Sequence, residues 1–174
     1  MQQVTLLRTP VAMRRLAFAL VPVLALLVLT PSPARTQDAD HRAMVERVLS
    51  STPLIDGHND LPWAIRGSDA APKDVHAPEH DLRQRTPFHT DIPRLREGMV
   101  GAQFWSVYIP YGAVEEGAAM VQLEQIDIAQ EIFRTYPDVF GEALSASDVE
   151  RVFGGGRIAS IMGMEGGHAI ENSL

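Results

Sequence analysis

The stretch LIDGHNDLPW, residues 54–63, decides how the rest of the chain is interpreted. A short apolar run opens it and ends at Asp56-Gly57, which predicts a buried strand over Leu54–His58. His58 and Asp60 follow two residues apart, and in extended chain such residues point to the same face. Imidazole and carboxylate groups bind divalent metals such as zinc, so the end of this strand is a candidate metal site.

A second apolar run, near the other end of the chain, closes with a further ligand-type side chain. This run covers residues 157–165 and ends at Glu165, just as His58 and Asp60 follow the first run. In parallel β/α architectures the carboxyl ends of the strands share one rim, so the three side chains are expected to converge there. The alternative is that Glu165 caps the N–H groups that follow it, helped by Gly166-Gly167, and the sequence leaves both interpretations open.

The other histidines are not expected to bind metal. His168 lies beyond the strand end, so it is interpreted as a supporting or capping residue. His76, His80 and His89 fall in the segment 66–90, which glycines and prolines punctuate and which is expected to contain little secondary structure. Because no helix or strand fixes them, these three are interpreted as surface histidines.

The remaining pattern alternates strands with helices. A strand that is apolar on both faces, as a strand covered on both sides should be, is expected over Val100–Ile109. Helices are expected over Gln37–Ser50, Asp91–Glu97 and Val114–Tyr136, and over a short segment that Ser147 opens with a capping box and Gly154 ends. Strands separated by helices predict parallel β/α units, so the predicted fold class is α/β.

Composition narrows the chemistry. With 174 residues, a single domain is expected. The chain has no cysteine, which excludes disulfides and thiolate metal sites, so any metal site must use His, Asp and Glu. The formal net charge is −7 and there is no long basic run, which argues against nucleic acid as a partner.

The N-terminus has the pattern of a targeting segment. Positive charges that include Arg14-Arg15 precede an apolar run over Leu16–Leu29, which is shorter than the ~20 residues that a membrane-spanning helix needs. Small residues at Ser32 and Ala34 complete the pattern of a secretory signal peptide. We therefore expect residues 1–34 to be a signal peptide, cleaved after Ala34, and the protein to be exported. The alternative is an uncleaved segment that anchors the chain in the membrane.

Three separated motifs together resemble the membrane (renal) dipeptidase family. They are IDGHNDLPW at 55–63, GAQFWSVY at 101–108 and EGGH at 165–168. DIPRL at 91–95 and LEQID at 123–127 are also similar to that family. The resemblance runs from about Met44 to Leu174, with the motifs in the family's order and at its spacing.

The resemblance implies a metal-dependent (β/α)₈ barrel that hydrolyses dipeptides, with two zinc ions that activate a water. In that arrangement His58 and Asp60 are ligands of one zinc, and Glu165 bridges both ions. Trp63 is implied to border the substrate pocket. The family's further ligands come from later strands, so the second zinc site is incomplete in this chain.

The length departs from the family's pattern. A (β/α)₈ barrel typically needs ~250 residues, whereas this chain ends at Leu174, just after its third expected strand. Residues 35–174 are therefore interpreted as about three β/α units, the N-terminal portion of a dipeptidase barrel domain, and the chain alone is not expected to hydrolyse dipeptides. Two alternatives stay open: a related amidohydrolase for D-amino-acid dipeptides or other small amides, and a non-catalytic exported binding protein. Oxygen and nitrogen ligands also accept manganese or cobalt, so the sequence does not fix the metal.

Overall fold

The structure is a computed structural model and describes residues 33–171. The chain divides into two units, residues 1–42 and residues 43–174, and the second contains every described strand. Apart from its last two residues, the expected signal peptide lies outside the described part, so it stays a prediction. Among the described helices, none is both long and apolar enough to cross a membrane.

The first described element is the helix α2, Pro33–Ser51. The helix expected over Gln37–Ser50 is therefore confirmed, and it extends further toward the N-terminus. Met44, Val45 and Val48 are apolar, share one face of α2 and are each more than half exposed. Periodicity predicts such a stripe, but it does not say what covers it.

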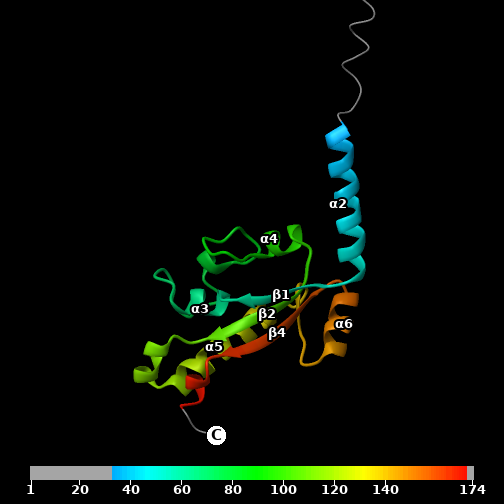
Figure 1. The fold of residues 1–174 in the computed structure, drawn as a ribbon. Coiled ribbons are helices and arrows are strands. Elements are labelled where there is room, and N and C mark those ends of the chain that lie inside the picture. The colour runs from blue at the N-terminus through cyan, green and yellow to red at the C-terminus, as the bar shows by residue number, and fades with distance from the viewer. Residues whose placement is uncertain (1–32, 172–174) are drawn as a thin grey trace, which may run out of the picture. The chain divides into compact units, whose positions relative to one another are not determined.

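A parallel sheet of four strands forms the centre of the second unit (Figure 1). The strands are β1 (Leu54–Asn59), β2 (Val100–Tyr108), β3 (Phe140–Glu142) and β4 (Ile158–Glu165), in the spatial order β1-β2-β4-β3. All three pairings are parallel, which confirms the α/β prediction. The strand β3 was not predicted, because three residues are too few for an apolar period to be visible.

The strand β1 contradicts the prediction of a buried strand. Leu54 is 41% exposed and Ile55 is 48% exposed, and the other residues of β1 are exposed or only partly buried. The reason is topological, since within the described residues β1 pairs only with β2 and forms an edge of the sheet. By contrast β2 lies between β1 and β4, and it is buried almost throughout, with Phe104 as the exposed exception.

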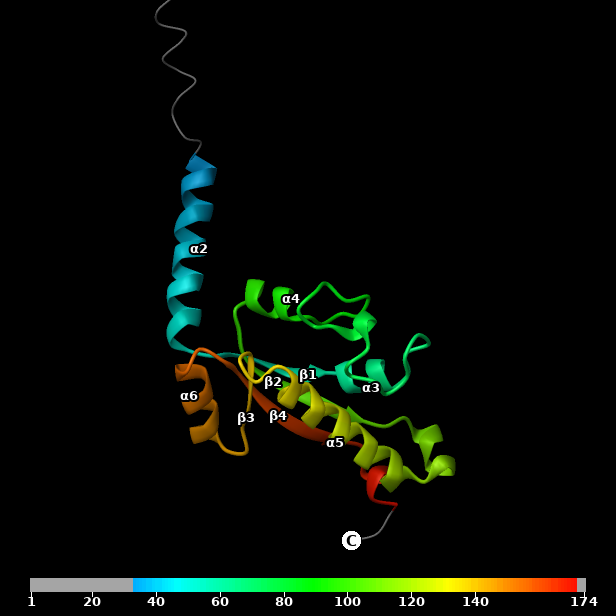
Figure 2. The ribbon, with the colours of Figure 1, turned by 180° about the vertical axis from the view of Figure 1, so that it is seen from behind.

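The helix α5 (Ala118–Thr135) lies across one face of the sheet, as Figure 2 shows. A continuous helix was expected over Val114–Tyr136. It is instead divided into a 3₁₀ turn at Tyr111–Glu116 and α5, because Gly117 between them has a φ of +88°, which breaks the helical path.

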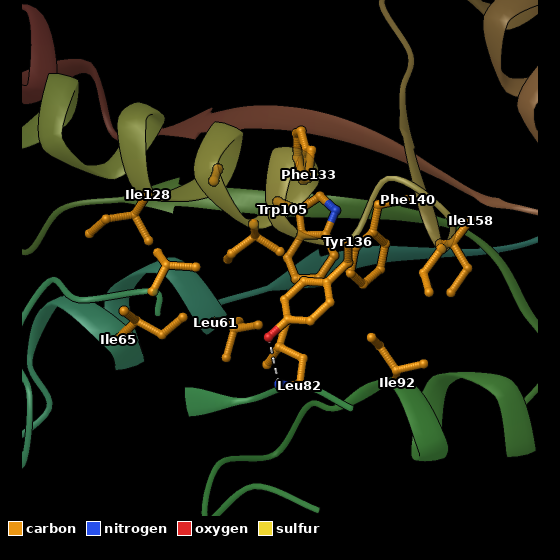
Figure 3. Close-up of a cluster of buried hydrophobic side chains, with 14 of the residues drawn as sticks. Leu61, Ile65, Leu82, Ile92, Trp105, Ile128, Phe133, Tyr136, Phe140 and Ile158 are labelled. Carbon is orange, nitrogen blue, oxygen red and sulfur yellow. Dashed lines mark hydrogen bonds between the residues drawn. The ribbon is translucent and has the colours of Figure 1, made fainter. Parts of the chain in front are cut away.

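Aromatic side chains fill the core between α5 and the sheet (Figure 3). The Trp105 ring is fully buried and meets the Phe140 ring edge to face, with centroids 5.3 Å apart. Tyr136 belongs to the same cluster, and its hydroxyl accepts a hydrogen bond from the Leu82 backbone N–H at 3.0 Å. The core therefore joins the sheet and α5 to the irregular segment that contains Leu82.

That segment connects the short helix α3 (Leu61–Arg66) to α4 (Ile92–Glu97). As expected, it contains little secondary structure, only a 3₁₀ turn at Pro78–His80. His80, however, is buried, so its interpretation as a surface histidine is wrong. Its Nδ1–H donates to the Asp74 carbonyl at 2.6 Å, and its Nε2 lies 2.8 Å from the Ser68 hydroxyl. These two bonds fix the ring without any help from a helix or strand.

The helix α6 (Ala146–Gly154) packs against β4 and carries a shifted cap. Ser145, rather than Ser147, accepts the N–H of Asp148 at 3.2 Å. The Asp148 carboxylate in turn accepts the Leu144 N–H at 3.2 Å. The cap therefore lies two residues earlier than predicted, and it differs from a standard capping box because the Asp148 carboxylate accepts the N–H of Leu144 rather than that of Ser145, the N-cap.

Candidate metal centre

The structure brings His58, Asp60 and Glu165 together, although more than a hundred residues separate the first two from the third. His58 lies near the end of β1, Asp60 directly follows that strand, and Glu165 is the last residue of β4. The parallel register explains the meeting, because the carboxyl ends of neighbouring parallel strands lie on one edge of the sheet. The convergence expected from the sequence is therefore observed.

The distances within this cluster suit one cation. His58 Nε2 lies 3.1 Å from Asp60 Oδ1 and 3.6 Å from Glu165 Oε2, and one ligand atom from each residue falls within 4.8 Å of the others. Ligands about 2.1 Å from a common zinc ion lie roughly 3–4 Å apart. One imidazole nitrogen with two carboxylates is a donor set that zinc and manganese accept. Each of the three side chains is about half exposed, so they are accessible from solvent.

Contacts around Glu165 orient its carboxylate toward the cluster. The Ser106 hydroxyl on β2 donates to Glu165 Oε2 at 3.3 Å. Gly166 follows with a φ of +92°, which turns the chain directly after the carboxylate. A Cβ at Gly166 would collide with the His168 ring, so this turn requires glycine. Among the described residues, the Glu165 carboxylate accepts a hydrogen bond from Ser106 on β2 and not from an N–H of the following turn Gly167–Ile170, so the capping role that the sequence also allowed is not observed.

His168 stays outside the cluster, as expected. Its Nε2–H donates to the Ile109 carbonyl at 3.0 Å, and its ring meets the Tyr111 ring edge to face. This bond fastens the segment after β4 to the end of β2, so His168 supports the turn that presents Glu165.

Asn59, between the ligands His58 and Asp60, is a functional candidate that was not predicted from the sequence. Its Nδ2 donates to Thr90 Oγ1 at 2.9 Å and lies 3.3 Å from Gln103 Oε1. Its Oδ1 accepts the backbone N–H of Leu61 at 3.1 Å. The alternation of side chains along a strand was the available signal, since it turns Asn59 away from the face that its neighbours share.

A cavity of about 580 Å³ opens beside the first two ligands. Its wall includes His58 and Asp60 from the end of β1, together with Phe88, His89 and Arg94. The sequence did not predict this wall, because residues 66–90 carry no periodic pattern that would place them next to β1.

An ion pair with a buried carboxylate fixes the wall. The Asp91 carboxylate caps α4 by accepting the Arg94 N–H at 2.9 Å, and it also accepts the Arg94 guanidinium Nε–H at 2.7 Å. Burial alone would raise the pKa of the Asp91 carboxyl, but the hydrogen bonds from Arg94 and from the Thr86 N–H outweigh it and lower that pKa. The guanidinium also donates to the Phe88 carbonyl at 2.6 Å, so it holds the segment that lines the cavity.

Trp63, expected to border a substrate pocket, packs elsewhere on the same rim. Its ring meets the Tyr108 ring edge to face at 5.9 Å, and the Arg66 guanidinium lies 5.2 Å from its centroid. It is not among the residues that line the 580 Å³ cavity. Its role toward a substrate stays a prediction.

A parallel sheet with a His–Asp–Glu cluster at its carboxyl rim defines an α/β protein with a metal-type site. Residues 42–174 match the sequence pattern of the membrane dipeptidase family, peptidase family M19, and the chain belongs to this family.

Relatives agree with this assignment. A dipeptidase of Aspergillus terreus, ataJ, is 42% identical over 136 residues, which are 74% of this chain and 32% of that protein. Two solved structures share the fold. One is a metallo peptidase from Rhodobacter sphaeroides liganded with a phosphinate mimic of the dipeptide L-Ala-D-Ala, with a TM-score of 0.54, 21% identity, and coverage of 68% of this chain and 39% of that one.

The other is the probable dipeptidase PvdM from Pseudomonas aeruginosa, with a TM-score of 0.58 and 16% identity. That alignment covers 82% of this chain and 34% of PvdM. The chain thus spans about a third of the length of the proteins that it matches. The fold class predicted from the sequence is confirmed as an α/β structure that corresponds to part of these dipeptidases.

Proposed function

We propose that this protein is a metal-dependent dipeptidase in which His58, Asp60 and Glu165 bind zinc. The observation that carries the proposal is the convergence of these three side chains, whose candidate ligand atoms lie within 4.8 Å of one another. Family membership supports it independently. The chain spans about a third of its relatives, so the proposal concerns the whole protein, with this chain supplying one part of the site.

His58, Asp60 and Glu165 each contribute a different group to the proposed metal site. When bound, zinc supplies a Lewis acid that activates a water and polarises the peptide carbonyl. His58 and Asp60 contribute one nitrogen and one oxygen from the end of β1. Glu165 approaches from β4, and its carboxylate has two oxygens, which allows it to serve two cations, as the family resemblance implies. Ser106 holds one of those oxygens in place.

The cavity beside His58 and Asp60 is where we place part of the dipeptide. Its volume of about 580 Å³ lies within the range of ~300–1,000 Å³ that is usual for small-molecule sites. The Rhodobacter sphaeroides neighbour was solved with a dipeptide mimic, which supports a dipeptide as the substrate class. Trp63 on the same rim is a second candidate for substrate contact.

Zinc binding by the purified chain tests the metal assignment. We expect His58→Ala and Asp60→Ala each to abolish the zinc retained in equilibrium dialysis. His76→Ala is the matched control, because His76 is also exposed and also lies beside a carboxylate, that of Glu131, at 3.0 Å. If the His58→Ala and His76→Ala variants retain equal amounts of zinc, the assignment is wrong.

Two alternatives from the sequence are separated by activity. A related amidohydrolase would prefer other small amides, so the substrate panel for the full-length protein should contain dipeptides with either an L or a D residue at the C-terminus, as in L-Ala-D-Ala. A non-catalytic binding protein would retain zinc and hydrolyse none of them.

We also propose that the protein is exported through residues 1–34. The support is the charge and apolar pattern of that segment. N-terminal sequencing of the protein recovered outside the cytoplasm should find a start directly after Ala34. A start at Met1 would instead indicate that the segment is retained as an anchor.

A further inference from the structure

Asn59 is the last residue of β1, lies between the ligands His58 and Asp60, and makes several side-chain hydrogen bonds. The Thr90 hydroxyl lies 2.9 Å from Asn59 Nδ2 and 3.1 Å from Asn59 Oδ1, so one hydroxyl contacts both ends of the amide. Gln103 Oε1 on β2 lies 3.3 Å from Nδ2. Both Thr90 and Gln103 are buried, whereas His58 and Asp60 are about half exposed. The amide is therefore held by buried groups, whereas the two ligand side chains are open to solvent.

The backbone of β1 does not fix the ligands by itself. The pairing of β1 with β2 is irregular between Asp56 and Asn59, so the ladder of backbone hydrogen bonds is interrupted beside His58. Asp60 lies beyond the strand. The bond from the Leu61 N–H to Asn59 Oδ1 closes a turn around Asp60 and sets the direction in which its carboxylate leaves the backbone.

The same contacts connect the ligands to the cavity wall. The Thr90 carbonyl accepts the Thr86 hydroxyl at 2.9 Å, and Thr90 directly precedes the buried Asp91. Because Asp91 and Arg94 fix this wall, a displacement of Asn59 would shift both the metal ligands next to it and the wall that follows Thr90.

We infer that Asn59 is a positioning residue for the metal centre, held by Thr90, and that it sets the separation of His58 and Asp60. The inference rests on the proposed metal site. It predicts that loss of the Asn59–Thr90 contact weakens metal binding while the fold persists. Partners that orient metal ligands typically affect metal affinity by about 10–100-fold.

Cobalt(II) provides the probe, because its visible absorption reports both affinity and coordination geometry. The 174-residue chain is titrated with cobalt(II), and far-UV circular dichroism checks the fold. We expect Asn59→Ala and Thr90→Val to weaken binding about tenfold and to alter the absorption bands. Thr90→Ser keeps the hydroxyl and should restore near-normal affinity.

Thr135→Val is the matched control for Thr90→Val. It removes a hydroxyl of the same type on α5, whose oxygen is buried and has no hydrogen-bond partner among the described residues. Amide hydrogen exchange at Leu61 adds a structural readout and should accelerate in Asn59→Ala but not in Thr135→Val.

The outcomes separate the two proposals. If the unchanged chain binds no cobalt(II), the metal site itself is wrong, and this inference falls with it. If the unchanged chain binds cobalt(II), and Asn59→Ala and Thr90→Val bind it with the same affinity and spectrum, only the positioning role is wrong. If Asn59→Ala fails to fold, the pair Thr90→Val and Thr90→Ser decides, because valine matches threonine in shape.

Discussion

Near the start of both α4 and α6 an aspartate is followed three residues later by an arginine, but Asp91 is the N-cap of α4, whereas Asp148 lies three residues after Ser145, the N-cap of α6. At α4 the pair is Asp91 and Arg94, and at α6 it is Asp148 and Arg151. The Asp91 side chain is 0% exposed, whereas that of Asp148 is 29% exposed and that of Arg151 is 62% exposed. The Arg94 guanidinium also reaches the Phe88 carbonyl in the cavity wall. The same spacing thus yields a structural anchor at one site and a more exposed pair at the other, because the two aspartates differ in burial and in their position relative to the helix cap.

The largest expected effect is that of Asp91→Ala. It removes the cap of α4 and leaves the Arg94 charge without its buried partner, which we expect to lower the free energy of unfolding by about 3 kcal/mol. Urea unfolding of the chain measures it. Asp148→Ala is the matched change at α6 and should shift the midpoint far less. Equal shifts would show that burial does not distinguish the two pairs.

Substitution of the two arginines tests the same comparison, with a smaller expected change in the free energy of unfolding. Arg94→Lys keeps the charge but cannot contact Asp91 and the Phe88 carbonyl together, so we expect a loss of about 1–2 kcal/mol. Arg151→Lys should leave the unfolding midpoint unchanged, since a lysine can still approach Asp148 in water. The contrary result, a larger effect at Arg151, would remove the basis for calling Asp91–Arg94 the anchor.

The smallest expected effect is the dependence of α6 on pH. Hydrogen bonds from Arg151, Ser145 and the Leu144 N–H lower the pKa of Asp148 from 3.8 to about 2. A folded-state pKa below the unfolded one stabilises the protein above the unfolded value, and this contribution disappears as the pH falls through about 2.

Thermal unfolding at several pH values should therefore find Asp148→Asn less stable than the unchanged chain at pH 6, with the difference vanishing near pH 2. A difference that stays constant across that range would mean that the charge of Asp148 is irrelevant to its role at α6.

The sequence was sufficient for the parts of the fold that depend on local pattern. Apolar runs located β2 and β4, and strand ends located the convergence of His58 with Glu165. Parallel geometry makes that convergence predictable, because it depends only on strand direction and on where each strand stops.

Features that depend on residues far away in the sequence could not be predicted from local patterns. The composition of β1 predicted burial, but exposure is decided by whether a second strand pairs with it, and its own residues carry no such information. Nor does any local pattern show that His80 would be buried or that Asn59 would meet Thr90, thirty-one residues away. The assignment of His58, Asp60 and Glu165 as ligands is still a prediction.

The turn at Gly166 has a consequence for engineering the site. Its backbone conformation excludes side chains, and the His168 ring occupies the space that a Cβ would need. A library that randomises positions 164 and 166 to alter selectivity, with Glu165 and His168 kept, should return glycine at position 166 in every well-folded variant. Diversity would be tolerated at Met164, which is exposed and borders the same rim. The surroundings of Glu165 can thus be altered by substitution at Met164, which precedes it, but not at Gly166, which follows it.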